Sequence, residues 1–185
     1  GATEPRAYAE LVLYLTHMLA DPVQPRRGLL AARIYAKIAP NAGHAQHMTS
    51  HIFVALGMWT EVVDANVAAI TVVDKVRKAA GKGPSGCGHY PSWLGYGYLQ
   101  LGQMDNAKNA VAQCRAAVEL AAATERHGAS MDPDNSLAGS FANMRLRYVI
   151  DPGGWPTAIS GWSLPKNAGP GARRRSVASR RGSQD

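Results

Sequence analysis

The chain has 185 residues, of which 46% are hydrophobic and 18% are charged. This composition is typical of a folded globular chain and excludes wholesale disorder, and the length suffices for one domain or a short array of repeats. The formal net charge is +7, but more than half of it, +4, falls between residues 151 and 185. A basic tail supports nucleic-acid binding far less than a basic stripe on a folded face, so nucleic-acid association through the tail is only a minor alternative.

The sequence carries no targeting or membrane signal that we can identify. No apolar run approaches the roughly 20 residues of a membrane helix, and no basic segment followed by an apolar stretch stands at the start. This pattern favours a soluble, cytoplasmic chain with no membrane partner. The first residue is Gly1 rather than Met, so we expect a fragment or a processed product, and the compartment of the full protein stays open.

Helical periodicity and turn residues predict an all-α chain. No segment shows the alternation of apolar and polar residues that a strand requires. The fourth predicted helix starts at Trp59, and its end is blurred by a Lys/Gly-rich stretch, 75–88, which reads as a loop or a frayed extension. The other predicted helices cover residues 7–20, 28–39, 41–56, 91–101, 105–125 and 135–150.

One pattern recurs: an aromatic residue, a Gly four positions later, and a bulky residue two positions beyond. It occurs from Phe53 to Trp59 and again from Tyr98 to Met104. The pattern resembles the tetratricopeptide repeat, in which a Gly separates two antiparallel helices. The resemblance implies a right-handed solenoid of stacked helix pairs over residues 1–164, with three repeats and a degenerate fourth. The remainder, 165–185, has no apolar periodicity and is predicted to be a basic disordered tail.

A more specific resemblance lies in the segment from His44 to Phe53, which reads His-Ala-Gln-His-Met-Thr-Ser-His-Ile-Phe. It is similar to a little-characterised bacterial family of tetratricopeptide-like proteins with an HAxHMPSHIF-type stretch. The upstream segment from Tyr14 to His17 also matches that family, whereas Thr49 stands where the family tends to have Pro. The resemblance implies a fold and leaves the reaction open.

The repeat register places five of the six histidines on inner helices that face the concave groove, the surface with which such solenoids bind their partners. The sixth, His127, is better explained as a charge at a helix C-terminus. Tyr96 takes an equivalent place in the third repeat. The predicted ligand-binding residues are therefore His17, His44, His47, His51, His89 and Tyr96.

The spacing of these histidines also predicts a metal site. His47 and His51, four residues apart on a helix, have the spacing at which two imidazoles share one ion. His17 or His89 from a neighbouring helix would be the third ligand of a divalent metal such as zinc. No carboxylate stands between His47 and His51, so a hydrolytic site would lack a proton acceptor in the motif.

Three interpretations of the cluster stay open: hydrogen-bonded groups between packed helices, polar contacts for a ligand in the groove, or metal ligands. The first functional hypothesis is a scaffold whose histidine- and aromatic-lined groove binds a protein, peptide or small ligand. The alternative is a metal-binding protein, with hydrolysis as its further option. Exposed solenoid ends would also permit self-association.

Two further predictions concern single residues. Asn66 stands on a helix face otherwise made of Val and Ala, and we expect it to hydrogen-bond to the preceding helix. Cys87 and Cys114 form no CxxC unit, and we expect one loop thiol and one buried thiol.

Overall fold

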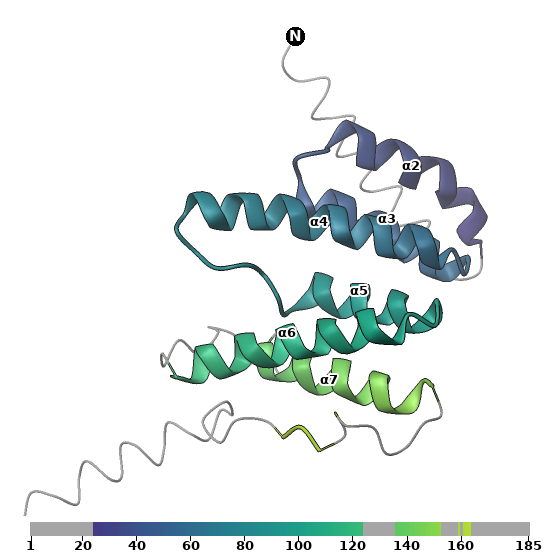
Figure 1. The fold of residues 1–185 in the computed structure, drawn as a ribbon. Coiled ribbons are helices and arrows are strands. Elements are labelled where there is room, and N and C mark those ends of the chain that lie inside the picture. The colour runs from purple at the N-terminus through teal and green to yellow at the C-terminus, as the bar shows by residue number, and fades with distance from the viewer. Residues whose placement is uncertain (1–23, 124–135, 153–158, 160, 164–185) are drawn as a thin grey trace, which may run out of the picture.

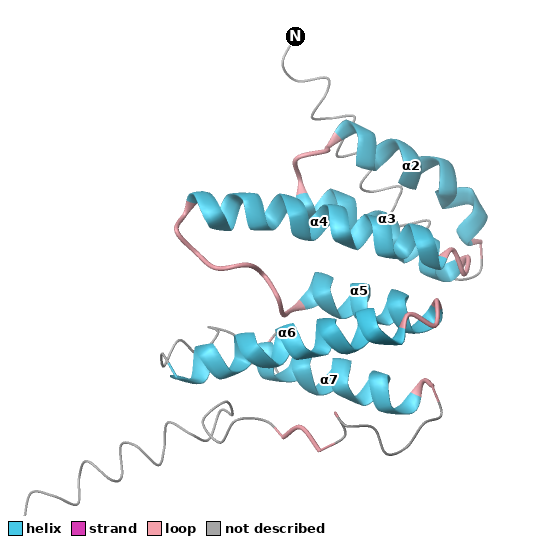
Figure 2. Cartoon of the chain, in the orientation of Figure 1, coloured by secondary structure: helices cyan, strands magenta, loops and turns pink. Residues whose placement is uncertain are grey.

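A computed structural model of the chain describes residues 24–123, 136–152, 159 and 161–163. All regular structure in these residues is helical, which confirms the predicted all-α class (Figure 2). A short 3-10 helix, η1, precedes six α-helices. Their bounds are η1 Pro25–Gly28, α2 Leu29–Ile38, α3 Gly43–Ala55, α4 Trp59–Ala79, α5 His89–Gln100, α6 Met104–Ala123 and α7 Leu137–Ile150.

The observed helices follow the predicted ones closely, with two differences. Helix α4 continues through Lys75 to Ala79, so the connection to α5 is shorter than the predicted stretch 75–88. Helix α5 begins at His89, two residues before the expected start at 91. The predicted first helix, 7–20, and the predicted tail, 165–185, lie outside the described residues.

Consecutive helices pack against one another along the whole described chain. Each helix from α2 to α6 contacts the next, and α5 also contacts α7 (Figure 1). Gly97 allows the close approach of α5 to α4, because a Cβ at this position would stand 2.9 Å from a methyl group of Val63. The sequence of contacts places α3, α4 and α5 side by side, and this group carries the histidines.

The two predicted glycine turns share one backbone geometry. Gly57 and Gly102 have φ angles of 69° and 68°, in the left-handed region where a side chain would be strained. After Gly57, the N–H of Met58 donates to the carbonyl of Phe53 at 2.9 Å, and the N–H of Gln103 donates to Tyr98 in the same way at 2.9 Å. Both helices therefore end in the same hydrogen-bonded C-cap, as the repeated sequence pattern predicts.

The largest apolar core lies among α5, α6 and α7. It includes Phe141, Met144 and Tyr148 of α7 packed against the buried face of α6, and Ile159 beyond them. Smaller apolar clusters join α2 to α3 and α4. The apolar packing is thus concentrated in the second half of the described chain.

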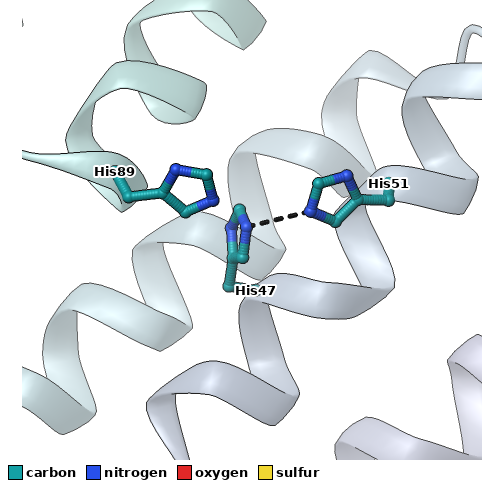
Figure 3. A group of neighbouring side chains, drawn as sticks. All are labelled: His47, His51 and His89. Atoms are coloured by element: carbon teal, nitrogen blue, oxygen red, sulfur yellow. Dashed lines mark hydrogen bonds between the residues drawn. The ribbon is translucent and has the colours of Figure 1, made fainter. Parts of the chain in front are cut away.

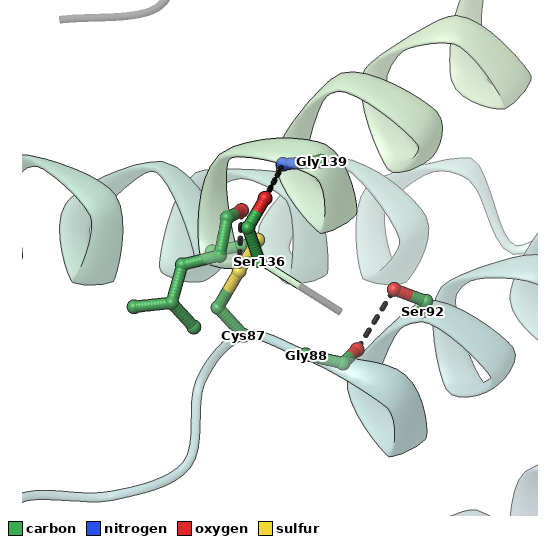
Figure 4. The surroundings of a disulfide bond; sticks show 7 residues. Cys87, Gly88, Ser92, Ser136 and Gly139 are labelled. Carbon is green, nitrogen blue, oxygen red and sulfur yellow. Dashed lines mark hydrogen bonds between the residues drawn. A yellow bond between two sulfur atoms is a disulfide. The ribbon is translucent and has the colours of Figure 1, made fainter. Parts of the chain in front are cut away.

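Cys87 and Cys114 form a disulfide that ties the segment before α5 to α6 (Figure 4). The expectation of two separate thiols is therefore wrong. Both cysteines are buried, and sequence spacing could not show that the helix pairing brings them together. The disulfide fixes the position of the chain two residues before His89.

Among the described residues, no helix is both long enough and apolar enough to cross a membrane.

Candidate metal centre

Three histidines from two helices converge between α3 and α5. His47 and His51 lie one turn apart on α3, and His89 is the first residue of α5. Each of the three offers a ring nitrogen, and these nitrogens all lie within 4.8 Å of one another. Figure 3 shows the three imidazoles turned toward a common region. We call these residues the histidine triad.

The innermost member, His47, is held by a side chain of α4. Its Nδ1 lies 2.8 Å from Oδ1 of Asn66, and the Asn66 amide nitrogen donates to the carbonyl of Val62, also at 2.8 Å. The second bond orients the amide so that Oδ1, which can only accept, faces the imidazole. Nδ1 of His47 is therefore the protonated nitrogen, and the lone pair resides on Nε2.

That lone pair points toward His51. Nε2 of His47 and Nε2 of His51 are 3.1 Å apart, within hydrogen-bond distance. Because Nε2 of a neutral His47 has no proton, His51 is the donor in this contact. The two nitrogens thus share one proton, and they stand where two ligands of one cation would stand.

Burial keeps His47 neutral. The side chain has no exposed surface, and burial, together with the charges that His89, His51 and His44 would carry, lowers its pKa to about 4. The hydrogen bond to Asn66 acts in the opposite direction and is outweighed. The pKa of His89 is also lowered, mainly by partial burial and to a smaller extent by the charge that His44 would carry. Both imidazoles are therefore neutral at pH 7, which is the form that binds metals.

Aromatic side chains of α5 surround the triad. The ring of Trp93 contacts that of His51, with centroids 4.9 Å apart, and the ring of Tyr90 lies 4.7 Å from that of His47. His89 is exposed, whereas His51 is half-buried. The centre is therefore enclosed on the side of His47 and reaches solvent on the side of His89.

The structure separates the predicted site residues into groups. His47, His51 and His89 meet. His44 lies one turn before His47 on α3 and is exposed, and it is not part of the triad. Tyr96 is removed from the imidazoles: its ring contacts those of Trp59, at 5.5 Å, and Trp93, at 6.4 Å. His17 lies outside the described residues, so the observed third member is His89.

Two neighbours of the triad differ in how well the sequence indicated them. Asn66 was expected to bond to the preceding helix, and the structure confirms that bond and gives His47 as its partner. Tyr90 was not singled out, although it directly follows His89. The only signal for it was its position at the start of a helix that already carried a candidate ligand.

A comparison with known proteins finds no matching family model, no matching curated protein and no matching solved structure.

Proposed function

We propose that this protein binds a divalent transition-metal ion, zinc or an ion of similar preference, through His47, His51 and His89. The observation that carries the proposal is the convergence of three ring nitrogens within 4.8 Å of one another, one of them on the fully buried, neutral His47. Isolated buried histidines are commonly satisfied by one hydrogen bond. Here the buried His47 directs Nε2 at a second imidazole, and a third offers a nitrogen within the same 4.8 Å, as the ligands of one cation would.

The spacing of the nitrogens supports this function. Two nitrogens bound to a tetrahedral zinc ion at 2.0–2.1 Å lie about 3.3–3.4 Å apart. The Nε2 atoms of His47 and His51 are 3.1 Å apart, so a shift of a few tenths of an ångström suffices. The third nitrogen, on His89, lies on the exposed side of the centre and would move closer to the other two on metal binding.

Asn66 would act as an outer-sphere partner, which is a residue that hydrogen-bonds to a metal ligand and not to the metal itself. A metal-binding histidine usually donates its second ring N–H to an oxygen, which fixes the tautomer and the ring orientation. Oδ1 of Asn66 accepts that proton from His47. The asparagine, itself fully buried, thereby aims Nε2 at the metal position before any ion arrives.

The chemistry of the ligands indicates the class of ion. All three donors are imidazole nitrogens, and no thiolate or carboxylate of the described residues joins them. Imidazole suits zinc, copper, nickel and iron, whereas magnesium and calcium require oxygen ligands. We therefore expect zinc, cobalt or nickel to bind and magnesium and calcium not to compete.

A role as a scaffold that binds a ligand in a groove explains the same residues less well. A groove ligand can touch the exposed His44 and His89, but it cannot touch His47, which has no exposed surface. The arrangement of helix pairs as a tetratricopeptide solenoid also stays a proposal, supported by the equal C-caps at Gly57 and Gly102. Neither idea accounts for the contact between His47 and His51.

Metal analysis of the purified protein tests the proposal. Protein stripped with a chelator and dialysed against a slight excess of zinc should retain close to one equivalent per chain. His89→Ala is the most informative variant, because the exposed residue can be removed without opening the core, and it should retain well under half an equivalent after the same dialysis. His127→Ala, which removes a histidine that belongs to no predicted metal set, should retain zinc like the wild type.

A wild type that retains less than a tenth of an equivalent would overturn the proposal. Equal retention by His89→Ala and the wild type would also contradict it. Circular dichroism of each variant establishes that the helices are intact.

A further inference from the structure

The histidine triad supplies three ligands and leaves one side of the centre open. Among the described residues, the group of converging His, Cys, Asp and Glu side chains ends with the three histidines. Its enclosed side is occupied by His47 and Asn66, and its open side is marked by the exposed His89. A tetrahedral ion held by three protein ligands keeps its fourth position for a molecule from solvent.

The charge at this position is strongly uncompensated. Three neutral imidazoles leave the full double charge on a bound divalent ion. Among the described residues, no carboxylate belongs to the group of converging side chains. The described ligands therefore leave that charge uncompensated.

The aromatic rings strengthen the effect of that charge. Trp93 lies against His51 and Tyr90 against His47, so aromatic surface flanks the centre. Lower local polarity increases the attraction between a cation and an anion beside it. A neutral ligand such as water gains much less from such surroundings than an anion does.

On this basis we propose that the fourth position binds a small, exchangeable anion, such as hydroxide, a carboxylate or azide, through an oxygen or nitrogen donor. This inference rests on the proposed metal-binding function and adds the class of ligand that the metal takes. It requires the triad to be a three-ligand site open to solvent rather than a closed structural site.

Cobalt(II) in place of zinc makes the fourth ligand visible, because its d–d absorption depends on the ligands and the geometry. The probe is sodium azide, titrated into the cobalt-loaded full chain at constant ionic strength. Sodium perchlorate, which coordinates weakly, is the matched control. We expect a saturable spectral change with azide, with one azide bound per cobalt, and no change with perchlorate.

The outcomes separate this inference from the function beneath it. A cobalt spectrum of a four-coordinate site that azide leaves unchanged would keep metal binding and overturn the anion proposal. If His44→Ala then made the spectrum sensitive to azide, His44 would be identified as the fourth ligand, and the proposal would again be overturned. A chain that develops no d–d absorption with cobalt would refute both.

Discussion

The two halves of the described chain bury very different side chains. Helices α5 to α7 enclose an apolar core around Phe141, Met144 and Tyr148, reinforced by a disulfide. Between α3 and α4, by contrast, the buried side chains include His47 and Asn66, and several of their neighbours are also polar. The buried polar side chains of α3 and α4 are Gln46, His47, Thr49, Ser50 and Asn66.

Two helices of this chain pack with almost no buried polar side chain between them. Helices α6 and α7 pack through apolar side chains, and Ser140 is the buried polar residue of that pair. Burying a polar group costs free energy unless its hydrogen bonds are replaced. In the α3–α4 half, the hydrogen bonds of His47 and Asn66 offset this cost, and the proposed metal site would account for a polar pair at this position.

The largest effect on stability is expected from a cavity in the apolar core of α5 to α7. Phe141→Ala removes a fully buried ring and should lower the free energy of unfolding by about 3–5 kcal/mol. Its zinc affinity, measured at low temperature where the helices persist, should stay within a few-fold of the wild type. Chemical denaturation and a competition titration give the two numbers. A parallel loss of both would show that the two halves do not act separately.

A change of pH should act on the polar half. His47 has a pKa of about 4 in the folded chain against 6.5 for a free imidazole, so between these values the unfolded chain binds a proton that the folded chain does not. Stability is therefore full above pH 6.5 and falls as the pH drops toward 4, by up to about 3 kcal/mol. Denaturation of the metal-free protein across this range measures it. His47→Gln should remove this part of the pH dependence, and an unchanged dependence would contradict the assignment.

Loss of the outer-sphere contact should weaken metal binding without abolishing it. Asn66→Ala leaves all three imidazoles in place but removes the acceptor of the His47 Nδ1–H. Contacts of this type usually change metal affinity by about 10- to 100-fold. Asn66→Asp keeps an acceptor at the same position and should retain most of the affinity. Equal affinities for Asn66→Ala and the wild type would show that the bond does not orient the ligand.

The smallest effect is expected on the surface of α6. Arg115 and Glu119 form an exposed ion pair one turn apart, at 2.9 Å. Glu119→Ala should change the free energy of unfolding by less than about 0.5 kcal/mol and leave zinc binding unchanged. Thermal unfolding with and without zinc checks both. A larger change would mean that this exposed ion pair contributes more to the free energy of unfolding than we expect.

The helices were predictable because turn glycines and apolar periodicity are local signals. Gly57 and Gly102 ended their helices where the sequence indicated, and six helix positions were confirmed to within a few residues. The disulfide was not predictable, since Cys87 and Cys114 are 27 residues apart and meet only through the packing of the segment before α5 on α6.

The site was predictable in part for the same reason. The pairing of His47 with His51 follows from helical spacing, and both contribute to the observed triad. The sequence offered His17 or His89 as the third member, and the position of His89 in the triad depends on how α5 sits against α3 and α4, which local patterns do not specify. The burial of His47 was likewise outside their reach, and it is this burial that distinguishes a preoriented ligand from a groove-lining contact.

X-ray absorption of the zinc-loaded protein tests the central claim most directly, because it reports the atoms bound to the ion. We predict a first shell of nitrogen and oxygen atoms at about 2.0–2.1 Å, with the outer-shell scattering of three imidazoles and its reduction in His89→Ala. A sulfur shell at about 2.3 Å, or a shell of oxygens without imidazole scattering, would contradict a metal centre built from His47, His51 and His89.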